Sequence, residues 1–521
     1  MRFTIFFTIF VLLFGSLAAQ VNGEIETTEG KIIVKVWGSH YERGEAHGYL
    51  LSEEIMDIYN QYVISYLFNN NSGQYEYARG LFMDYFNYET KYQNEAEGII
   101  DGMELAGQEL YVNSLDRELD HLDVLMANSV IDILYLETLS NKDRDDLFGC
   151  SSISSWGDAT IDDSELEGEL LITRFMDWST NDVLEDNPIM LISFPEEDDE
   201  QPWLSFTYPS MFGSLSAINS SGIATFLNIG NNHDANNYDN IYPVLLSGRN
   251  AIEMEDYNND GDNTIFDIYD AINDHTNLSG VLYHVVGTAE QDPPSIIVET
   301  NNSLGTVYRD YTDNTLIEGS NLASTNHFRK LIDPISCFRY ENIVDSLSYS
   351  TDMTEERSWT LLRGAAGLGH NAMAIEYNYN TGKILWSNRT HSIPAYLNEK
   401  SIFYLEDLME SPTAIDDSHD NDPKPIDLPY TTYPNPFIVG SNSLTNISFT
   451  LPKAARVDLS VYNLKGKKIN EVVEKKLESG EHIFTWNGLD NKGKQVGSGL
   501  YFFKLKLDDE KEYVRKSLLI K

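Results

Sequence analysis

The chain has 521 residues, 41% of them hydrophobic, and its formal net charge at neutral pH is −46. This length predicts two or three domains, and the hydrophobic content is enough to build their cores. Because such a negative charge repels nucleic acid and anionic headgroups, we expect no nucleic-acid partner.

The chain opens with the features of an export signal. Arg2 precedes an apolar run from Phe3 to Phe14, and small residues follow between Ala19 and Gly23. The alternative, a membrane anchor, needs about 20 apolar residues, which is more than this run supplies. We therefore expect residues 1–23 to be a signal peptide of a bacterial secreted or outer-surface protein, with no integral membrane segment after its removal.

The next segments change from helical to strand-like patterns. Residues 24–149 open with a strand-like run at 31–38 and then place apolar residues three and four apart, which predicts an α-rich leader or propeptide. Residues 150–405 contain short β-type runs interrupted by helical patterns at 243–275 and 335–348. The class predicted for this part of the chain is α+β.

The last ninety residues form a separate module. Residues 431–521 hold 15 Lys+Arg and 10 Asp+Glu, whereas the chain before them is strongly acidic. A stretch rich in Pro, Asp and Ser precedes them, so residues 406–432 are predicted to be a linker. Alternating apolar residues with turns at 463–466 and 490–493 predict a β-sandwich over 433–521.

This module resembles the FlgD-like immunoglobulin-type domain that ends many type IX secreted proteins. The resemblance rests on four runs of the module, YPNPF, VYNLKGKKI, WNGLDNKGKQVGSGLYFFKL and KSLLIK. It implies sorting by a secretion machinery, with no chemistry in the module itself. The alternative is an adhesive β-sandwich.

Cys150 is the strongest candidate for chemistry. The sequence contains two cysteines, and Cys150 follows Gly149 at the junction between the helical leader and the first predicted strand of the β-rich part. Cleavage between Gly149 and Cys150 would leave one residue with a thiol nucleophile and a free α-amine of pKa about 8 as its base. The alternatives are a buried structural cysteine and a disulfide from Cys150 to Cys337.

Further polar residues follow Cys150 in a fixed order. They are Arg174 and Asp177 in TRFMDW, Asn228 in INSSGIATFLNIG, Asn326 in STNHF and Arg339 in SCFRYENI. Taken singly, Arg174 and Asp177 would be a surface ion pair and the two asparagines would be turn residues. Arg339 would be a charged residue at the start of a helix.

Together with the runs at Gly38–Gly48 and Asn94–Met103 and with GCSSISSWGDA, the order resembles the isopenicillin N acyltransferase family. More distantly, it resembles choloylglycine hydrolases and acid ceramidase. All are cysteine N-terminal-nucleophile (Ntn) hydrolases, and the resemblance spans most of residues 30–395. It implies a four-layer αββα sandwich that processes itself and cleaves linear amides of small molecules or peptides through a thioester, by hydrolysis or acyl transfer, without a catalytic cofactor.

The resemblance also implies a role for each residue. Cys150 would be nucleophile and base, Arg174 would hold the thiolate, and Asp177 would bind the α-amine. Asn228 and Asn326 would form the oxyanion hole, and Arg339 would brace this network or meet a substrate carboxylate. The sequence departs from the family pattern at Ser151, at Phe175 and in an acidic insertion at 161–169.

A second group of residues has the spacing of an EF-hand calcium loop. Oxygen-bearing side chains occur at loop positions one, three, five, seven, nine and twelve, with Gly261 at position six; they are Asp256, Asn258, Asp260, Asp262, Thr264 and Asp267. Helical patterns flank the loop, so a structural calcium ion is predicted. In so acidic a chain, composition alone is the alternative explanation.

Two other functions compete with the self-processing amidase. One is a non-catalytic surface binding protein with the same fold. The other is a phospholipase B-like or ceramidase-like lipid amidase.

Overall fold

The computed structural model describes residues 21–135, 148–313, 316–365, 370–391, 393–411, 430–433, 437–438, 444–451, 453–463, 467–497, 499–507 and 511–520. Residues 1–20 of the predicted signal peptide lie outside this set. The chain divides into two compact units, Met1–Ala414 and Ile415–Lys521. None of the helices among the described residues has the length and apolar character needed to cross a bilayer.

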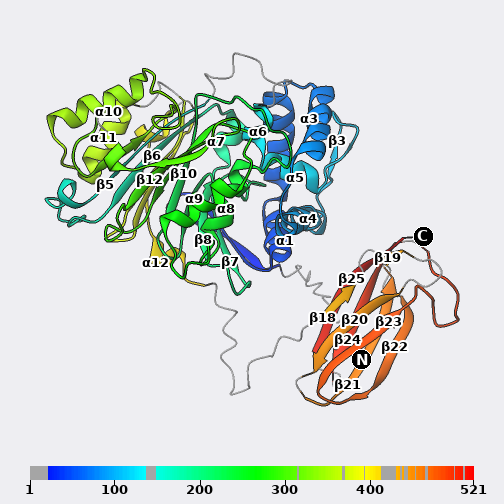
Figure 1. Ribbon diagram of the computed structural model, residues 1–521. Helices are drawn as coiled ribbons and strands as arrows, with labels where there is room; N and C mark the ends of the chain where they lie inside the picture. The colour runs from blue at the N-terminus through cyan, green and yellow to red at the C-terminus, as the bar shows by residue number, and fades with distance from the viewer. Residues whose placement is uncertain are drawn as a thin grey trace, which may run out of the picture. The chain divides into compact units, whose positions relative to one another are not determined.

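Two β-sheets form the centre of the first unit (Figure 1). The nine-stranded sheet contains, in spatial order, β1 (Gly23–Thr28), β2 (Lys31–Gly38), β7 (Ile189–Pro195), β8 (Trp203–Thr207), β9 (Ser216–Asn219), β10 (Ala224–Ile229), β11 (Val281–Val286), β12 (Ser295–Asn301) and β13 (Gly305–Arg309). The six-stranded sheet contains β14 (Asn321–Ser324), β5 (Phe148–Ser155), β6 (Leu171–Trp178), β15 (Asn371–Asn378), β16 (Lys383–Asn388) and β17 (Ser401–Tyr404). A short hairpin joins β3 (Tyr111–Val112) and β4 (Arg117–Glu118).

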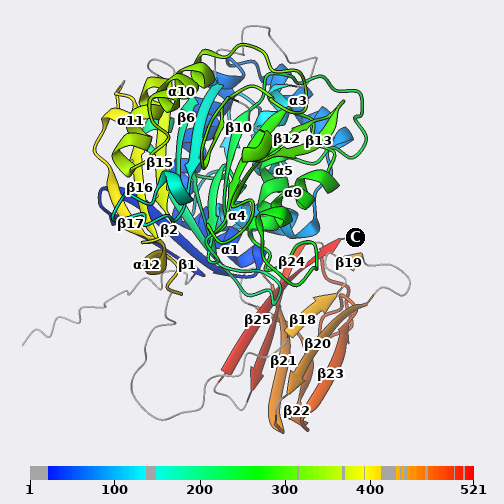
Figure 2. The ribbon, with the colours of Figure 1, turned by 60° about the vertical axis from the view of Figure 1, so that its left-hand side comes forward.

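Helices cover both sheets. The six-stranded sheet packs against α10 (Phe338–Tyr349) and α11 (Glu355–Ala365), and the nine-stranded sheet packs against α8 (Val244–Ile252) and α9 (Ile265–Asp274). The two sheets contact each other through β5 with β10 and β14 with β12. Figure 2 shows α10 and α11 beside β15 and β16, and α9 beside β12 and β13. The α+β class predicted from the sequence is therefore confirmed to the extent that helices and sheets are mixed in this unit.

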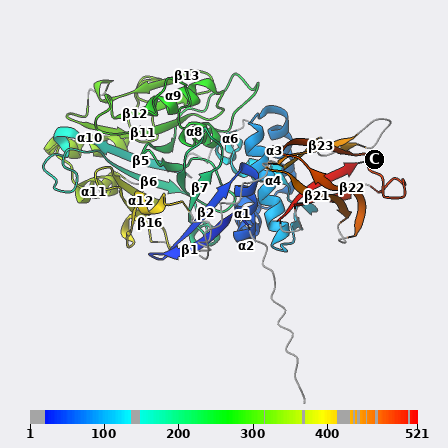
Figure 3. The same ribbon diagram turned by 90° about the horizontal axis from the view of Figure 1, so that it is seen from below.

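The predicted leader is built into this unit. Its helices are α1 (His40–Leu50), α2 (Ser52–Asp57), α3 (Ser72–Tyr85), α4 (Thr90–Leu105), α5 (His121–Ala127), α6 (Val130–Leu134) and a π-helix, Ile58–Leu67. They gather at one end of the unit, away from α10 and α11 (Figures 1 and 3). Its strand β2 pairs in parallel with β7, which belongs to the part of the chain after Cys150. The short helices α7 (Asp182–Asp186) and α12 (Leu405–Leu408) complete the unit.

Glycines spaced four apart let α1 and α4 pack backbone against backbone. A Cβ atom on Gly44 or Gly48 of α1 would lie 2.0 or 1.9 Å from a carbonyl oxygen of α4. A Cβ atom on Gly98 or Gly102 of α4 would likewise lie 2.2 or 2.0 Å from a carbonyl oxygen of α1. Only glycine permits this approach, so the two leader runs that carry the family resemblance are helix contacts rather than catalytic segments.

The second unit is rich in β-structure, as the sequence predicted. One sheet contains β18 (Tyr430–Tyr433), β20 (Thr445–Leu451) and β23 (Gly480–Trp486), and the other contains β19 (Phe437–Ile438), β25 (Lys511–Ile520), β24 (Gly499–Leu507), β21 (Ala455–Asn463) and β22 (Lys468–Leu477). Trp486, Phe503 and Leu459 lie in its own buried core. This core is separate from the clusters of the first unit.

Because the second unit has its own core, we expect the first unit to keep its stability without it. A chain that ends at Ala414 should unfold at the same temperature as the first transition of the whole protein, measured by calorimetry. A clear fall in that temperature would contradict the independence of the two units.

Candidate active site

The register between β5 and β6 arranges the candidate residues on two faces of the six-stranded sheet. Ser152 lies opposite Arg174, and Gly149 lies opposite Asp177. Opposite residues share a face and successive residues alternate. Cys150 and Arg174 therefore face the nine-stranded sheet, whereas Asp177 faces the helices. The acidic insertion at 161–169 lies in the turns that join the two strands.

Arg174 lies against the thiol of Cys150. Its Nη2 is 3.6 Å from Cys150 Sγ and donates to the carbonyl oxygen of Leu227 at 2.8 Å. The side chain is fully buried, and its Nε and Nη1 have no hydrogen-bond partner in the part of the chain that the structure describes. Burial raises the pKa of Cys150, and the positive charge of Arg174 opposes this rise. The site thus holds a buried cation whose hydrogen-bonding capacity is partly unused.

Asp177 and Arg339 meet at the peptide bond before Cys150. Arg339 Nη1, on α10, is 2.5 Å from Asp177 Oδ2, and Asn371 Nδ2 donates to Asp177 Oδ1 at 3.2 Å. A Cβ atom on Gly149 would lie 2.5 Å from Arg339 Nη2. Glycine at position 149 therefore leaves the space in which the guanidinium sits.

The two predicted oxyanion residues make different contacts. Asn326 accepts a hydrogen bond from the backbone N–H of Cys150 through Oδ1 at 2.9 Å and donates to Ile229 O at 2.8 Å. Asn228 donates to Ser152 Oγ at 3.3 Å, and no described residue pairs with its Oδ1. Asn326 thus meets the nitrogen of Cys150 through its oxygen, and its predicted role as an oxyanion donor stays a prediction.

The structure also brings residues to the site that no sequence signal identified. Asn371 begins β15, and a break in register between Asn371 and Met373 accompanies its contact with Asp177. Tyr208 lies close enough to Arg174 for each charge to shift the pKa of the other. Asn371 reaches the site through the pairing of β15 with β6, and Tyr208 directly follows β8, so no local motif identifies either residue.

An apolar pocket lies on the Tyr208 side of Arg174. Leader helices and strand ends line it with Ile58, Tyr59, Tyr62, Val63, Leu67, Phe68, Tyr75, Asp123, Met126, Ala127, Val130, Ile133, Leu134, Trp178, Leu184, Tyr208, Pro209, Ser210, Met211 and Leu215. Trp178 directly follows Asp177, and its Nε1 donates to the hydroxyl of Tyr62 at 2.6 Å. Most of this lining is apolar, so the pocket suits a hydrocarbon group.

Cys337 does not form the alternative disulfide. Both cysteines are free thiols, and Cys337 Sγ lies 3.4 Å from Thr325 Oγ1. Burial raises its pKa and hydrogen bonds from His327 and Thr325 lower it, to about 7 on balance. The disulfide alternative is therefore wrong, because the thiol packs at the start of α10 instead.

The predicted calcium loop connects α8 to α9. Asp256 accepts hydrogen bonds from the backbone of Asp260 and Gly261 at 3.2 and 2.9 Å, and Asp267 caps α9 through Thr264 N at 2.7 Å. Asp267 is thus engaged by backbone N–H groups. Calcium binding stays a prediction for this loop.

Among the described residues, one group of three His, Cys, Asp or Glu side chains has its ligand atoms within 4.8 Å of one another: His40, Glu200 and Glu253. Lys91 and Arg249 each lie 2.7 Å from Glu253. Because these cations already neutralise the carboxylates, the cluster is a buried ion network and does not suit a metal ion.

Comparison with known proteins gives a family match for the second unit. Residues 438–511 match the FlgD Ig-like domain. No curated protein matches the chain.

Among solved structures, the chain is similar to a Caenorhabditis elegans N-acylethanolamine-hydrolyzing acid amidase ortholog, at 14% identity over 49% of this chain and 100% of that chain, with a TM-score of 0.32. It is also similar to a conjugated bile acid hydrolase from Clostridium perfringens, at 10% identity over 49% and 93% of the two chains, with a TM-score of 0.31. FlgD from P. aeruginosa matches 16% of this chain and 66% of its own at 26% identity, with a TM-score of 0.14. With such low TM-scores, function has to be argued from the site itself.

Gly149→Ala should displace Arg339 from Asp177, because the new methyl group would occupy the place of Arg339 Nη2. A misplacement of about 1 Å near reacting atoms costs on the order of 100-fold in rate. We expect the predicted cleavage before Cys150 to slow by that order, measured from the rate at which fragments appear. Gly80→Ala is the matched control, because nothing lies within 4 Å of its Cβ position. Equal cleavage rates in both variants would contradict this role of Gly149.

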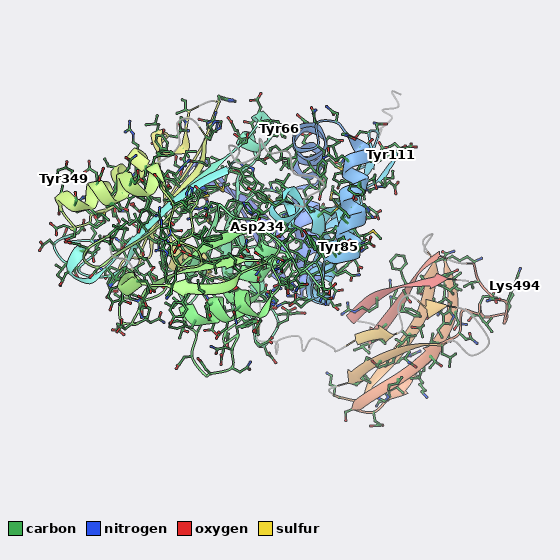
Figure 4. All side chains as sticks on the ribbon, turned by 45° about the horizontal axis from the view of Figure 1, so that its top comes forward. Tyr66, Tyr85, Tyr111, Asp234, Tyr349 and Lys494 are labelled. Carbon is green, nitrogen blue, oxygen red and sulfur yellow. The ribbon has the colours of Figure 1, made fainter. Side chains whose placement is uncertain are left out.

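Calcium at the 256–267 loop should raise the melting temperature relative to a chelator, because a ligand that binds only the folded state stabilises it. Asp256→Ala should abolish the shift, whereas Asp234→Ala, on another exposed loop (labelled in Figure 4), should leave it intact. An unchanged melting temperature in millimolar calcium would exclude the site.

Proposed function

We propose that this chain is a self-processing cysteine amide hydrolase whose nucleophile is Cys150. The observation that carries the proposal is the buried guanidinium of Arg174 against the Cys150 thiol, with two of its nitrogens unpaired. Unpaired buried donors are costly, and stabilisation of a thiolate and of the charge on a bound carbonyl group accounts for them. No cofactor is needed for this chemistry.

Self-cleavage would begin when the thiol of Cys150 attacks the carbonyl carbon of Gly149. The C–S bond forms, the C–N bond breaks, and the departing nitrogen takes up the proton lost by the thiol. Water then hydrolyses the thioester, which leaves a Gly149 carboxylate and a free Cys150 thiol and amine. Arg339 and Asp177 lie beside this bond and support the assignment.

Turnover would use the same thiol, with the new α-amine as its base. The amine takes the thiol proton, sulfur attacks the amide carbonyl, and the amine returns the proton to the departing nitrogen. Asn326 Oδ1, already 2.9 Å from this nitrogen, would hold the amine together with Asp177. Donors to the oxyanion are worth roughly 3 kcal/mol each, and Asn228 is the best placed to act as one. Water or an amine then accepts the acyl group.

The pocket beside Tyr208 favours substrates with an apolar acyl group. Its lining is largely hydrocarbon and aromatic, and Tyr208 connects it to Arg174. This feature favours the lipid amidase within the enzyme class. The competing binding protein of the same fold would need neither a free thiol nor an unpaired guanidinium at its centre.

Delivery to the outer surface belongs to the same proposal. The apolar start of the chain supports export, and the FlgD Ig-like match at 438–511 supports sorting by a secretion machinery. The helices on the outer faces of two contacting sheets support the four-layer αββα arrangement.

The purified chain should yield two fragments without added protease, and N-terminal sequencing of the larger should begin at Cys150. Cys150→Ala should stay whole, because it has no side-chain nucleophile. Cys150→Ser should cleave more slowly, since a hydroxyl is the poorer nucleophile at neutral pH. Cys337→Ala is the matched control and should cleave normally.

Mass spectrometry of the fragment with a panel of N-acyl amides would then detect an acyl adduct on Cys150. Cleavage that survives in Cys150→Ala, or amide hydrolysis by an uncut chain, would refute the proposal and favour the binding protein.

The two fragments should stay together after cleavage. His40 of the leader lies 2.8 Å from Glu95 and 2.9 Å from Glu200, and Arg249 lies 2.7 Å from Glu95, all in buried positions. The His40–Glu200 and Arg249–Glu95 contacts and the β2–β7 pairing join the parts of the chain on either side of the cut. Both fragments should elute in one peak on gel filtration and separate only in denaturant. Arg249→Met should weaken the association, because it removes the buried cation that Glu95 and Glu253 share and leaves Glu95 to His40 and Glu253 to Lys91.

A further inference from the structure

A histidine is buried between the two sheets, directly behind the candidate site. His284 lies on β11 opposite Phe226 of β10, and its side chain is fully buried. Burial lowers its pKa well below the usual value, and the positive charge of Arg309 adds to this effect. The ring is therefore neutral, with one nitrogen that donates and one that accepts.

One ring nitrogen faces the strand of the nucleophile. His284 Nδ1 lies 2.7 Å from Ser152 Oγ, and Ser152 shares a face of β5 with Cys150. Ser152 Oγ also accepts a hydrogen bond from Asn228 Nδ2 at 3.3 Å. Since that oxygen accepts from Asn228, its own proton is available to Nδ1.

The other ring nitrogen is held by two serines. His284 Nε2 lies 2.9 Å from Ser154 Oγ and 3.1 Å from Ser295 Oγ. Ser154 donates to Ser295 at 2.8 Å, and Ser295 donates to the carbonyl oxygen of Val285 at 3.2 Å. The proton on Nε2 therefore points toward the serines, which fixes the acceptor role of Nδ1.

We propose that His284 is a positioning residue that acts through Ser152 to hold the amide of Asn228 in place as the oxyanion donor. This inference rests on the proposed function, in which Asn228 stabilises the oxyanion. The chain of hydrogen bonds ends on a backbone carbonyl at one end and on Asn228 at the other. At the Asn228 end, Nδ2 donates one N–H to Ser152 and carries a second N–H, and Oδ1 has no partner among the described residues.

The location of this hydrogen-bond network, from Val285 O through His284 and Ser152 to Asn228, supports a role beyond stability. A polar network inside an apolar core gains little over hydrocarbon side chains unless all its members are satisfied. Here the polar atoms of His284, Ser152, Ser154 and Ser295 all have hydrogen-bond partners. An oxyanion donor such as Asn228 must be fixed in place before charge develops on the substrate oxygen, and this network would fix it. The network ends at Asn228, directly after Leu227, whose carbonyl oxygen accepts from the guanidinium that contacts the thiol of Cys150.

A double-mutant cycle tests the proposal on the full chain. Ser152→Ala should slow self-cleavage and the kcat for a straight-chain N-acyl aminomethylcoumarin by roughly tenfold, the size of one buried hydrogen bond, with KM unchanged. Asn228→Ala should slow both by on the order of 100-fold. The Ser152→Ala/Asn228→Ala variant should match Asn228→Ala alone, because Ser152 has nothing left to orient.

Two further variants separate positioning from folding. Ser155→Ala is the matched control: Ser155 lies on the same strand, bonds Asn321 at 2.6 Å on the other face, and should leave kcat unchanged. His284→Phe keeps an aromatic ring but loses both nitrogens, and it should reproduce the loss in kcat seen in Ser152→Ala.

Two outcomes would refute the positioning role of His284 and Ser152 while the proposed function stands. In one, the loss in the double variant equals the product of the two single effects; in the other, Ser152→Ala keeps the wild-type kcat. A wild-type chain that neither cuts itself nor hydrolyses amides refutes both.

Discussion

The register of β5 against β6 is the constraint on which the rest of the site depends. With Ser152 opposite Arg174, the strand alternation turns Cys150 and Arg174 inward and Asp177 outward. The thiol therefore meets the guanidinium of Arg174 between the sheets, while Arg339 of α10 reaches the preceding peptide bond from the other face. A slip of one residue would reverse the two faces and separate every one of these pairs.

Arg174 shows how the surrounding structure maintains an unfavourable arrangement. Its guanidinium is fully buried, and two of its nitrogens lack partners, which costs free energy of folding. The extended core between the two sheets offsets this cost. A charged group in a dry environment interacts more strongly with a nearby thiolate than it would in water. The same burial that raises the pKa of Cys150 therefore strengthens the interaction that opposes the rise.

The leader shares the core of the unit and does not merely precede it. Glycine pairs hold α1 against α4, and β2 extends the nine-stranded sheet. Buried ion pairs link α1 to Glu200 and α4 to Arg249, which both follow Cys150. The leader also supplies much of the apolar pocket. A cut at Gly149 would therefore free the amine of Cys150 while the leader helices that line the apolar pocket stay in place.

The sequence by itself determined the order of helical and strand-like segments, the β-rich second unit and the Gly-Cys junction, because these follow from local periodicity and residue type. Through the resemblance of their order to the isopenicillin N acyltransferase family, it also pointed to Arg174, Asp177, Asn228, Asn326 and Arg339. Only the tertiary structure decided that Asn326 accepts from the N–H of Cys150 through its oxygen. It also decided that Asn371 donates to Asp177 and that His284 contacts Ser152, which accepts from Asn228. These contacts join residues more than a hundred positions apart in several cases. Strand register and burial set them, and no local pattern encodes either.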